Sequence, residues 1–377
     1  MKSGGEHTLG IEEEYFLIDL ETRDLAADPP EALMRVCHEL LGEHVAPEFR
    51  RCQIEVGTPV CHSLAEARRQ IALYRRTIAT EAKRHGMGLM AASTHPFADW
   101  STQVTTDKER YAKLQADLRT VAERLLISGM HVHVGVPDED LRIDLHGQLV
   151  YFLPHLLALS VSSPFWRGRN TGLKSYRASI AVELPRAGLP QTFASASEYR
   201  RMVDLLVKLG RIEDASKIWW DLRPSARFPT LEMRITDVCT RLDDGVALAA
   251  VFQATVQMLI TLKRRNQRWR QYLPAMIAEN RWLAQRNGVF GELIDFGRGE
   301  TVPFADLAEE IVALVGEEAE KLGCRAEVEH IRRIAAEGTS ADRQLAVYAK
   351  AIEAGSSEKD ALKAVVDHLM AETLEGC

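Results

Sequence analysis

Residues 8–19 read Thr-Leu-Gly-Ile-Glu-Glu-Glu-Tyr-Phe-Leu-Ile-Asp. The apolar and aromatic residues of this stretch predict a β-strand. Because side chains at i and i+2 share one face of a strand, Glu12 and Glu14 lie on the same face. Phe16 and Ile18 continue that face. Two acids followed by two large hydrophobic residues predict a strand that runs from the mouth of a pocket into a core.

Three other stretches with strand character also carry polar residues two positions apart. They are Gln53 and Glu55, His131 and His133, and Glu232 and Arg234. Placing such groups on a sheet face that packs a core costs free energy unless they meet a cation or a charged ligand. Hard divalent cations need several oxygens that converge from different parts of a chain. The pattern therefore favours a metal-dependent enzyme.

Each pair also has a structural explanation. Carboxylates can be solvated on an exposed strand, a histidine in a strand is often a hydrogen-bonded core residue, and Glu232 with Arg234 can form an ion pair. Carboxylates outnumber the imidazoles, which favours Mg²⁺ or Mn²⁺ over zinc. Arginine is also the residue best shaped to grip a carboxylate or phosphate through two parallel hydrogen bonds.

Composition excludes several classes of protein. The 377 residues are 46% hydrophobic, so the chain can bury a sizeable core. Lysine and arginine total 47 against 54 acids, which disfavours nucleic-acid binding. The six cysteines show no CxxC spacing and the N-terminus shows no secretion signal, which predicts reduced thiols in a cytoplasmic protein. The most apolar predicted helix, residues 149–161, is too short to span a bilayer, so no membrane is expected.

The remaining pattern interleaves helices and strands without a regular βα repeat, which predicts an α+β fold with a largely antiparallel sheet. Capping-box patterns at Ser63 to Glu66 and at Thr106 to Glu109 predict two helix starts. The apolar residues that follow the second box predict one helix through Leu114, Leu118, Val121 and Leu125.

From about residue 242 the pattern is mostly helical, with a hairpin around Gly297-Arg-Gly299. We find no linker composition, so we predict a single elaborated catalytic domain over residues 1–377. Neither GxxxxGK[ST] nor a GxGxxG after a strand is present, so a nucleotide would need another architecture.

Eight short motifs occur in consecutive order along most of the chain. They are Gly10-Ile-Glu-Glu-Glu14, Ile54-Glu-Val-Gly-Thr-Pro59, Thr94-His-Pro-Phe97, Glu109-Arg-Tyr111, Gly129-Met-His-Val-His-Val-Gly135, Trp220-Asp-Leu-Arg-Pro-Ser225, Leu231-Glu-Met-Arg234 and Asn280-Arg-Trp-Leu-Ala-Gln-Arg-Asn-Gly288. This ordered set resembles the bacterial glutamate–cysteine ligase type 2 family, whose members are also called YbdK-type carboxylate-amine ligases.

The resemblance implies a glutamine-synthetase-like catalytic fold, in which an antiparallel sheet curves into a funnel with helices outside and metal ions inside. The implied metal ligands are Glu12, Glu14, Glu55, His131 and Glu232, with His131 rather than His133 from the histidine pair. The family arginines expected near the phosphates or the substrate carboxylate are Arg177, Arg223 and Arg234. The implied cofactors are ATP and Mg²⁺, with Mn²⁺ as a substitute, and the implied assembly is a homodimer.

The implied reaction joins a carboxylate, the γ-carboxylate of glutamate, to the amine of cysteine or a related amine through an acyl phosphate. Three alternatives stay open. A guanidino-type phosphotransferase would leave a phosphorylated product in place of an amide. A zinc-dependent hydrolase using His131 and His133 would work without ATP. A binding or assembly module on a degenerate ligase fold would bind nucleotide without turnover.

Overall fold

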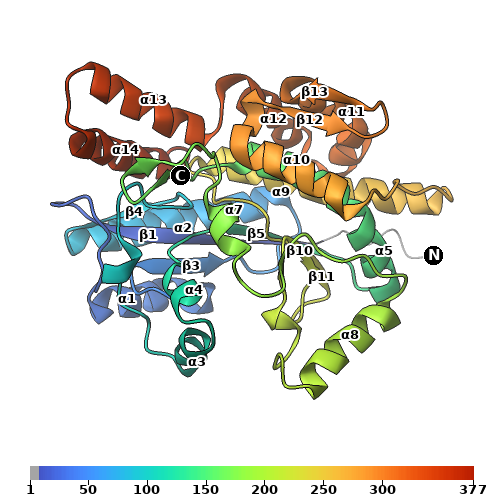
Figure 1. The fold of residues 1–377 in the computed structure, drawn as a ribbon, viewed down its shortest axis with the longest axis horizontal. Helices are drawn as coiled ribbons and strands as arrows, with labels where there is room; N and C mark the ends of the chain where they lie inside the picture. The colour runs from blue at the N-terminus through green and yellow to red at the C-terminus, as the bar shows by residue number, and fades with distance from the viewer. Residues whose placement is uncertain (1–7) are drawn as a thin grey trace.

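The computed structural model describes residues 8–377, and an open seven-stranded sheet lies at its centre (Figure 1). The strand order is β10, β11, β5, β1, β3 and β2, with β4 paired to the second half of β1, and all of these pairs are antiparallel. The strands are β1 (Leu9–Asp19), β2 (Val45–Pro47), β3 (Gln53–Gly57), β4 (Met87–Met90), β5 (Met130–Gly135), β10 (Leu222–Pro224) and β11 (Thr230–Met233).

The register of the sheet gathers the polar pairs on one face. The cross-strand partners are Glu12 with His131, Glu14 with Glu55, and Glu232 with His133. Directly paired residues in antiparallel strands project to the same side of the sheet. We call this side the polar face.

The strand β1 connects this polar face to a core, as the sequence predicts. Beyond Glu14, the side chains of Phe16 and Ile18 are fully buried in an apolar cluster. Met90 of β4 and Leu369, from the C-terminal helix, belong to the same cluster. One face of a single strand therefore serves both a polar site and a core.

The opposite face of the sheet packs on α2 (Leu64–Arg84) and α9 (Leu242–Arg264). By length and composition α9 is the one described helix that is apolar enough to cross a membrane, yet 83% of its most apolar segment is buried inside the protein. We therefore interpret α9 as a core helix. The predicted helix over 149–161 is divided between α5 (Glu139–Leu149), a 3₁₀ turn and α6 (Leu153–Ser160).

The C-terminal part is mostly helical and covers the α9 side of the sheet (Figure 1). It contains α10 (Pro274–Asn287), β12 (Glu292–Asp295), β13 (Glu300–Pro303), α11 (Phe304–Leu322), α12 (Arg325–Glu337), α13 (Ser340–Glu353) and α14 (Glu358–Thr373). The hairpin β12–β13 encloses the predicted turn. One apolar cluster extends from Leu9 to Ala341, so the helical part shares a core with the sheet.

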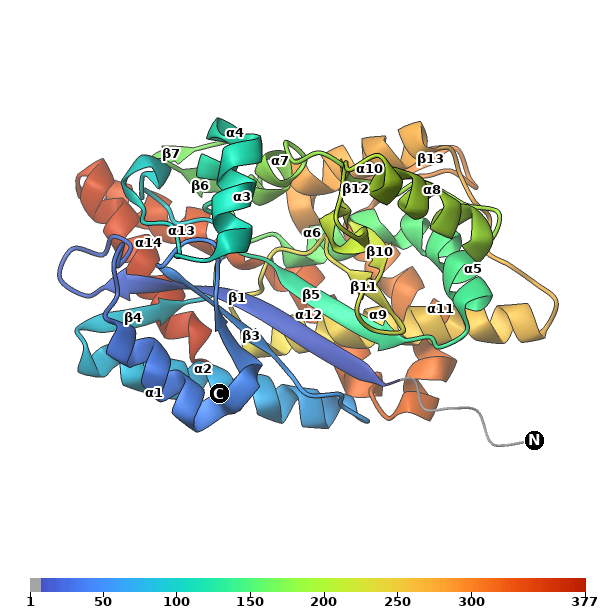
Figure 2. The ribbon, with the colours of Figure 1, turned by 90° about the horizontal axis from the view of Figure 1, so that it is seen from below.

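The described residues form five further α-helices and four further short strands. They are α1 (Glu31–Leu41), α3 (Glu109–Leu118), α4 (Thr120–Glu123), β6 (Phe165–Trp166), β7 (Arg169–Asn170), α7 (Arg177–Ala181), β8 (Ala187–Gly188), α8 (Ala196–Lys208) and β9 (Trp219–Trp220). Seen from the side of α3, the strands β1, β3 and β5 lie in front of α9 and α12 (Figure 2).

Two expectations about α3 are wrong. The helix starts after Lys108 without a side-chain cap, because the backbone of Thr106 is paired with a distant segment: its amide donates to the oxygen of Phe49 at 2.9 Å and its hydroxyl to the oxygen of Glu48 at 2.5 Å. The predicted single helix breaks at Arg119, which adopts a positive φ of 46° and separates α3 from α4.

The first capping box is formed only in part. The Ser63 hydroxyl accepts a hydrogen bond from the backbone of Glu66, as predicted. The Glu66 carboxylate accepts a hydrogen bond from the amide of His62 rather than from that of Ser63.

Candidate active site

Three of the predicted ligands form a compact donor group on the polar face. One ligand atom each from Glu12, His131 and Glu232 lies within 4.8 Å of the others. The Nδ1 atom of His131 lies 3.0 Å from Glu12, and Nε2 of His133 lies 3.4 Å from it. Burial opposes ionisation of Glu12, but the hydrogen bonds and charges of the two histidines outweigh it and hold the pKa of Glu12 well below its usual value.

A second acidic group consists of Glu14, Glu55 and Glu48. Burial, and then the charge of Glu48, raises the pKa of Glu14 to about 8. Burial, followed by the charges of Glu48, Glu12 and Glu14, raises the pKa of Glu55 well above its usual value. Neighbouring carboxylates that resist ionisation fit a divalent cation, because a cation would stabilise their ionised forms.

Sequence reasoning missed Glu48. This residue lies between β2 and β3, in a segment without strand alternation, so no periodic pattern marks it. The five predicted ligands share one face of the sheet, but they divide into the two groups just described rather than forming one cluster.

Arg234 and Arg223 both contact Glu232. Arg234 donates to Glu232, and its Nη1 lies 3.3 Å from Nδ1 of His131. Arg223 binds Glu232 through two hydrogen bonds of 2.8 and 3.0 Å. Burial opposes ionisation of Glu232, yet the charges of Arg234 and Arg223 lower its pKa to about 2.

Arg223 also holds the segment that covers the site. Its Nη1 donates to the backbone oxygens of Ser216 and Ile218, at 3.0 and 2.8 Å. Four of its five N–H groups are therefore engaged in contacts within the protein. Arg223 connects a candidate metal ligand to the chain that carries Lys217 and Trp219.

Arg177 contacts the backbone beside the site. Its Nη1 and Nη2 donate to the oxygens of Ile235 and Arg234, at 3.1 and 3.0 Å. Its guanidinium also lies against Gly129, whose amide donates to Glu14 at 2.7 Å. Residues from α7, β1 and the start of β5 are thus fixed relative to one another.

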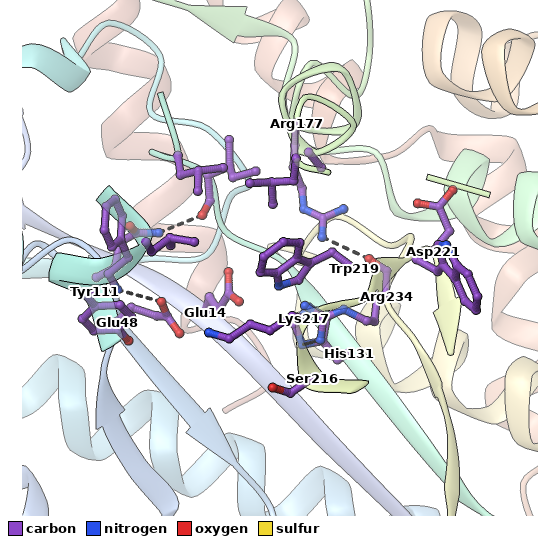
Figure 3. Close-up of a pocket in the computed structure, with 18 of the residues that line it drawn as sticks. Glu14, Glu48, Tyr111, His131, Arg177, Ser216, Lys217, Trp219, Asp221 and Arg234 are labelled. Carbon is purple, nitrogen blue, oxygen red and sulfur yellow. Dashed lines mark hydrogen bonds between the residues drawn. The ribbon is translucent and has the colours of Figure 1, made fainter. Parts of the chain in front are cut away.

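Two cavities flank the row of acids and imidazoles. The first, of about 350 Å³, is lined by Glu14, His131, Arg177, Lys217 and Arg234, among others, and we call it the arginine-lined cavity (Figure 3). The second, of about 510 Å³, is lined by Glu12, Glu55, His133 and mainly apolar side chains that include Val60 and Phe228, and we call it the apolar cavity. Arg223 lines neither of these two cavities.

Replacing Gly129 with alanine is expected to displace Arg177. The added Cβ would lie 2.6 Å from Nη2 of Arg177, which two backbone oxygens hold in place. We expect a loss of about 1–3 kcal/mol in the free energy of unfolding, measured with urea. Gly10→Ala is the matched control, because its added Cβ would meet nothing closer than 3.8 Å. Equal losses in both variants would contradict this expectation.

Mg²⁺ is expected to stabilise the protein more at pH 8 than at pH 6. The folded pKa of Glu14, about 8, exceeds the ordinary value of 4.5, so stability without metal falls as the pH rises between these values. A cation bound to the ionised carboxylates offsets that loss. Thermal unfolding with and without Mg²⁺ at both pH values measures the effect, which Glu14→Gln should reduce. The same Mg²⁺ shift at both pH values in the unaltered protein would contradict it.

Solved structures show the class of fold. A bifunctional glutathione synthetase from Pasteurella multocida aligns with a TM-score of 0.70 at 15% identity, over 98% of this chain and 53% of that chain. A glutamate–cysteine ligase from Francisella tularensis was solved in complex with AMP. It aligns with a TM-score of 0.70 at 13% identity, over 98% of this chain and 89% of that chain. These likenesses define a protein with the fold of glutamate–cysteine ligases and confirm the predicted α+β, glutamine-synthetase-like class.

Sequence comparison identifies the family. The family described as Glutamate-cysteine ligase family 2 matches residues 8–368. A relative from Rhodospirillum rubrum, named provisionally as a glutamate–cysteine ligase 2, is 58% identical over 97% of this chain and 95% of its own length. A second relative, from Jannaschia sp., carries the same name and is 55% identical over 97% of this chain and 96% of its own length. The chain belongs to Glutamate-cysteine ligase family 2, which supports an amide-forming ligase acting on small molecules.

Proposed function

We propose that the protein is an ATP- and Mg²⁺-dependent carboxylate-amine ligase that joins the γ-carboxylate of glutamate to the amine of cysteine or a related amine. One observation carries the proposal. The polar face of the sheet holds a row of acids and imidazoles, with the apolar cavity on one side of it and the arginine-lined cavity on the other. Family membership supports the same class of reaction.

The two cavities suit different parts of the reaction. The apolar cavity suits the adenine and ribose of ATP, with the half-exposed ring of Phe228 at its wall. The arginine-lined cavity suits the carboxylate substrate, because Arg177, Arg234 and Lys217 supply positive charge there. In this arrangement the γ-phosphate of ATP reaches the carboxylate across the row of acids.

The chemistry requires activation of the carboxylate, because its oxygen is a poor leaving group. A carboxylate oxygen attacks the γ-phosphorus of ATP, which yields an acyl phosphate and ADP. The amine nitrogen then attacks the acyl carbon, phosphate leaves, and the nitrogen loses a proton to give the amide. Each step depends mainly on positioning and on electrostatic stabilisation.

The chain's own residues have separate roles in this proposal. The donor sets suit Mg²⁺, or Mn²⁺ in its place, and the residues that would hold it are Glu12, Glu14, Glu55, His131 and Glu232. When bound, the metal would offset the charge of the phosphates. Arg234 orients Glu232 and lines the substrate cavity, Arg177 binds the substrate carboxylate, and Arg223 fixes Glu232.

An ATP-dependent screen of amino acids against amines, read by mass spectrometry, tests the proposal. We expect a new amide together with equal amounts of ADP and phosphate. A stable phosphorylated product without an amide would favour the guanidino-type phosphotransferase. Turnover without ATP, lost on zinc chelation, would favour the hydrolase, although the described donor group contains His131 without His133. Nucleotide binding without turnover across the whole panel would favour a binding module.

We also propose, on family resemblance alone, that the enzyme is a cytoplasmic homodimer. Light scattering after size-exclusion chromatography tests the assembly, with the mass of a dimer of the 42.2 kDa chain as the expected result. A monomeric mass at micromolar concentration would contradict it.

A further inference from the structure

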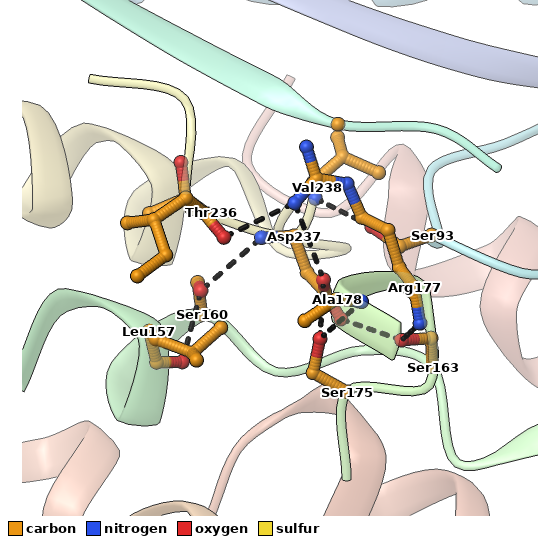
Figure 4. Close-up of polar contacts among 12 residues, drawn as sticks. Ser93, Leu157, Ser160, Ser163, Ser175, Arg177, Ala178, Thr236, Asp237 and Val238 are labelled. Carbon is orange, nitrogen blue, oxygen red and sulfur yellow. Dashed lines mark hydrogen bonds and ion pairs between the residues drawn. The ribbon is translucent and has the colours of Figure 1, made fainter. Parts of the chain in front are cut away.

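A buried carboxylate outside the row of candidate ligands lies next to Arg177 (Figure 4). Asp237 is fully buried and accepts three hydrogen bonds. The donors are the amide of Ser162 at 2.9 Å, the hydroxyl of Ser163 at 2.7 Å and the hydroxyl of Ser175 at 2.8 Å. Asp237 therefore joins the segment after β11 to the chain on both sides of β6 and β7.

Two of these serines connect Asp237 to the start of α7. The Ser163 hydroxyl accepts from the amide of Arg177 at 3.1 Å, and the Ser175 hydroxyl accepts from the amide of Ala178 at 3.3 Å. Each hydroxyl has a single proton, and donating it to Asp237 leaves its lone pairs free for these amides. Asp237 thus sets the orientation of both hydroxyls.

The helix α7 depends on this support from outside. It is five residues long, and its own N-cap residue, Tyr176, makes no side-chain cap. Short helices gain little stability from their own hydrogen bonds. The position of Arg177, the first residue of α7, therefore depends on the contacts that Asp237 organises.

Arg177 lines the arginine-lined cavity, and its hydrogen bonds within the protein use two of its five N–H groups. Its two terminal nitrogens are bonded to backbone oxygens, and Nη1 lies 3.9 Å from Asp237. Its Nε is buried and has no partner. Nη1 and Nη2 each keep a second N–H group, which can donate to an anionic oxygen in the cavity.

We propose that Asp237 is a positioning residue for the acid substrate, holding α7 so that the guanidinium of Arg177 faces the substrate carboxylate. This inference rests on the proposed function, in which the arginine-lined cavity receives that carboxylate. Asp237 itself touches no substrate in this arrangement. Its influence passes through Ser163, Ser175 and Arg177.

The first test is Asp237→Asn. The amide keeps the size of the carboxylate but turns one acceptor into a donor that faces other donors, so the start of α7 shifts. In the ligase assay we expect KM for glutamate to rise about tenfold, with KM for ATP unchanged. In an Arg177→Ala background the same substitution should change KM for glutamate by less than about twofold, because its effect passes through Arg177.

Ser160→Ala is the control for a purely structural effect. Its hydroxyl accepts from the amide of Asp237 at 3.2 Å and donates to Leu157 at 3.0 Å, within the same buried region but away from α7. We expect a lower melting temperature and an unchanged KM for glutamate. Should Asp237→Asn not fold, Ser175→Ala removes one hydrogen bond on the path and should raise KM by a smaller factor.

Two results would overturn the positioning role. One is an unchanged KM for glutamate in Asp237→Asn, and the other is independent, multiplying effects of Asp237→Asn and Arg177→Ala. Calorimetric titration with glutamate alone separates this role from the ligase proposal. Glutamate binding that weakens in Asp237→Asn, in a protein that makes no amide, would support the positioning role and overturn the ligase activity.

Discussion

Replacing Glu14 with glutamine is expected to lower ADP formation at least about 100-fold while leaving the fold intact. The buried carboxyl of Glu14 has a pKa of about 8, raised by burial and by Glu48, so the substitution replaces a group that is costly to ionise in the metal-free protein. We expect a melting temperature without metal that is equal or higher, and a smaller shift on adding Mg²⁺. A coupled ADP assay and thermal unfolding measure the two effects.

The matched control is Glu21→Gln, an exposed acid just beyond the end of β1. It changes the net charge by the same amount and should leave both measurements unaltered. Normal turnover in Glu14→Gln would remove Glu14 from the site.

Replacing Arg75 with methionine is expected to cost about 3–5 kcal/mol in the free energy of unfolding. Arg75 is fully buried in α2 and binds Glu13 through hydrogen bonds of 3.0 and 2.9 Å. It also donates to the backbone oxygens of Cys239, Thr240 and Thr373. Its removal leaves the Glu13 carboxylate buried without a counter-charge. Urea denaturation measures the loss.

Two further variants test the cause of that loss. Arg84→Ala, in the same helix, removes an arginine whose side chain is 67% exposed in its pair with Glu81, and should cost about 0–1 kcal/mol. Combining Arg75→Met with Glu13→Leu should recover part of the stability, because the unpaired charge is then absent. A loss below about 1 kcal/mol in Arg75→Met alone would contradict this account.

Much of the fold could be predicted from the sequence, because side chains alternate between the two faces of a strand. This alternation correctly predicted that Glu12 and Glu14 share a face, and that His131 and His133 do so as well. It also correctly placed Phe16 and Ile18 in a core. The predictions of a cap at Thr106 and of a single helix after it were wrong. Thr106 is bonded to the segment at Glu48, and Arg119 takes a positive φ between two short helices.

The site was less predictable because much of it depends on tertiary contacts. Glu48 lies in a segment without periodicity, so nothing local marks it as a neighbour of Glu14. The engagement of Arg223 with Ser216 and Ile218 depends on how the chain returns over the sheet. Asp237 lies after β11, and only the fold shows the serines that surround it.

We propose that acids and an imidazole from separate strands hold divalent cations between the two cavities. Crystals grown with Mn²⁺ and a non-hydrolysable ATP analogue test it directly, through the anomalous scattering of manganese. We expect peaks within about 2.0–2.6 Å of carboxylate oxygens of Glu12, Glu14, Glu55 and Glu232 and of a nitrogen of His131. Manganese bound only elsewhere, with the analogue in place, would contradict the account.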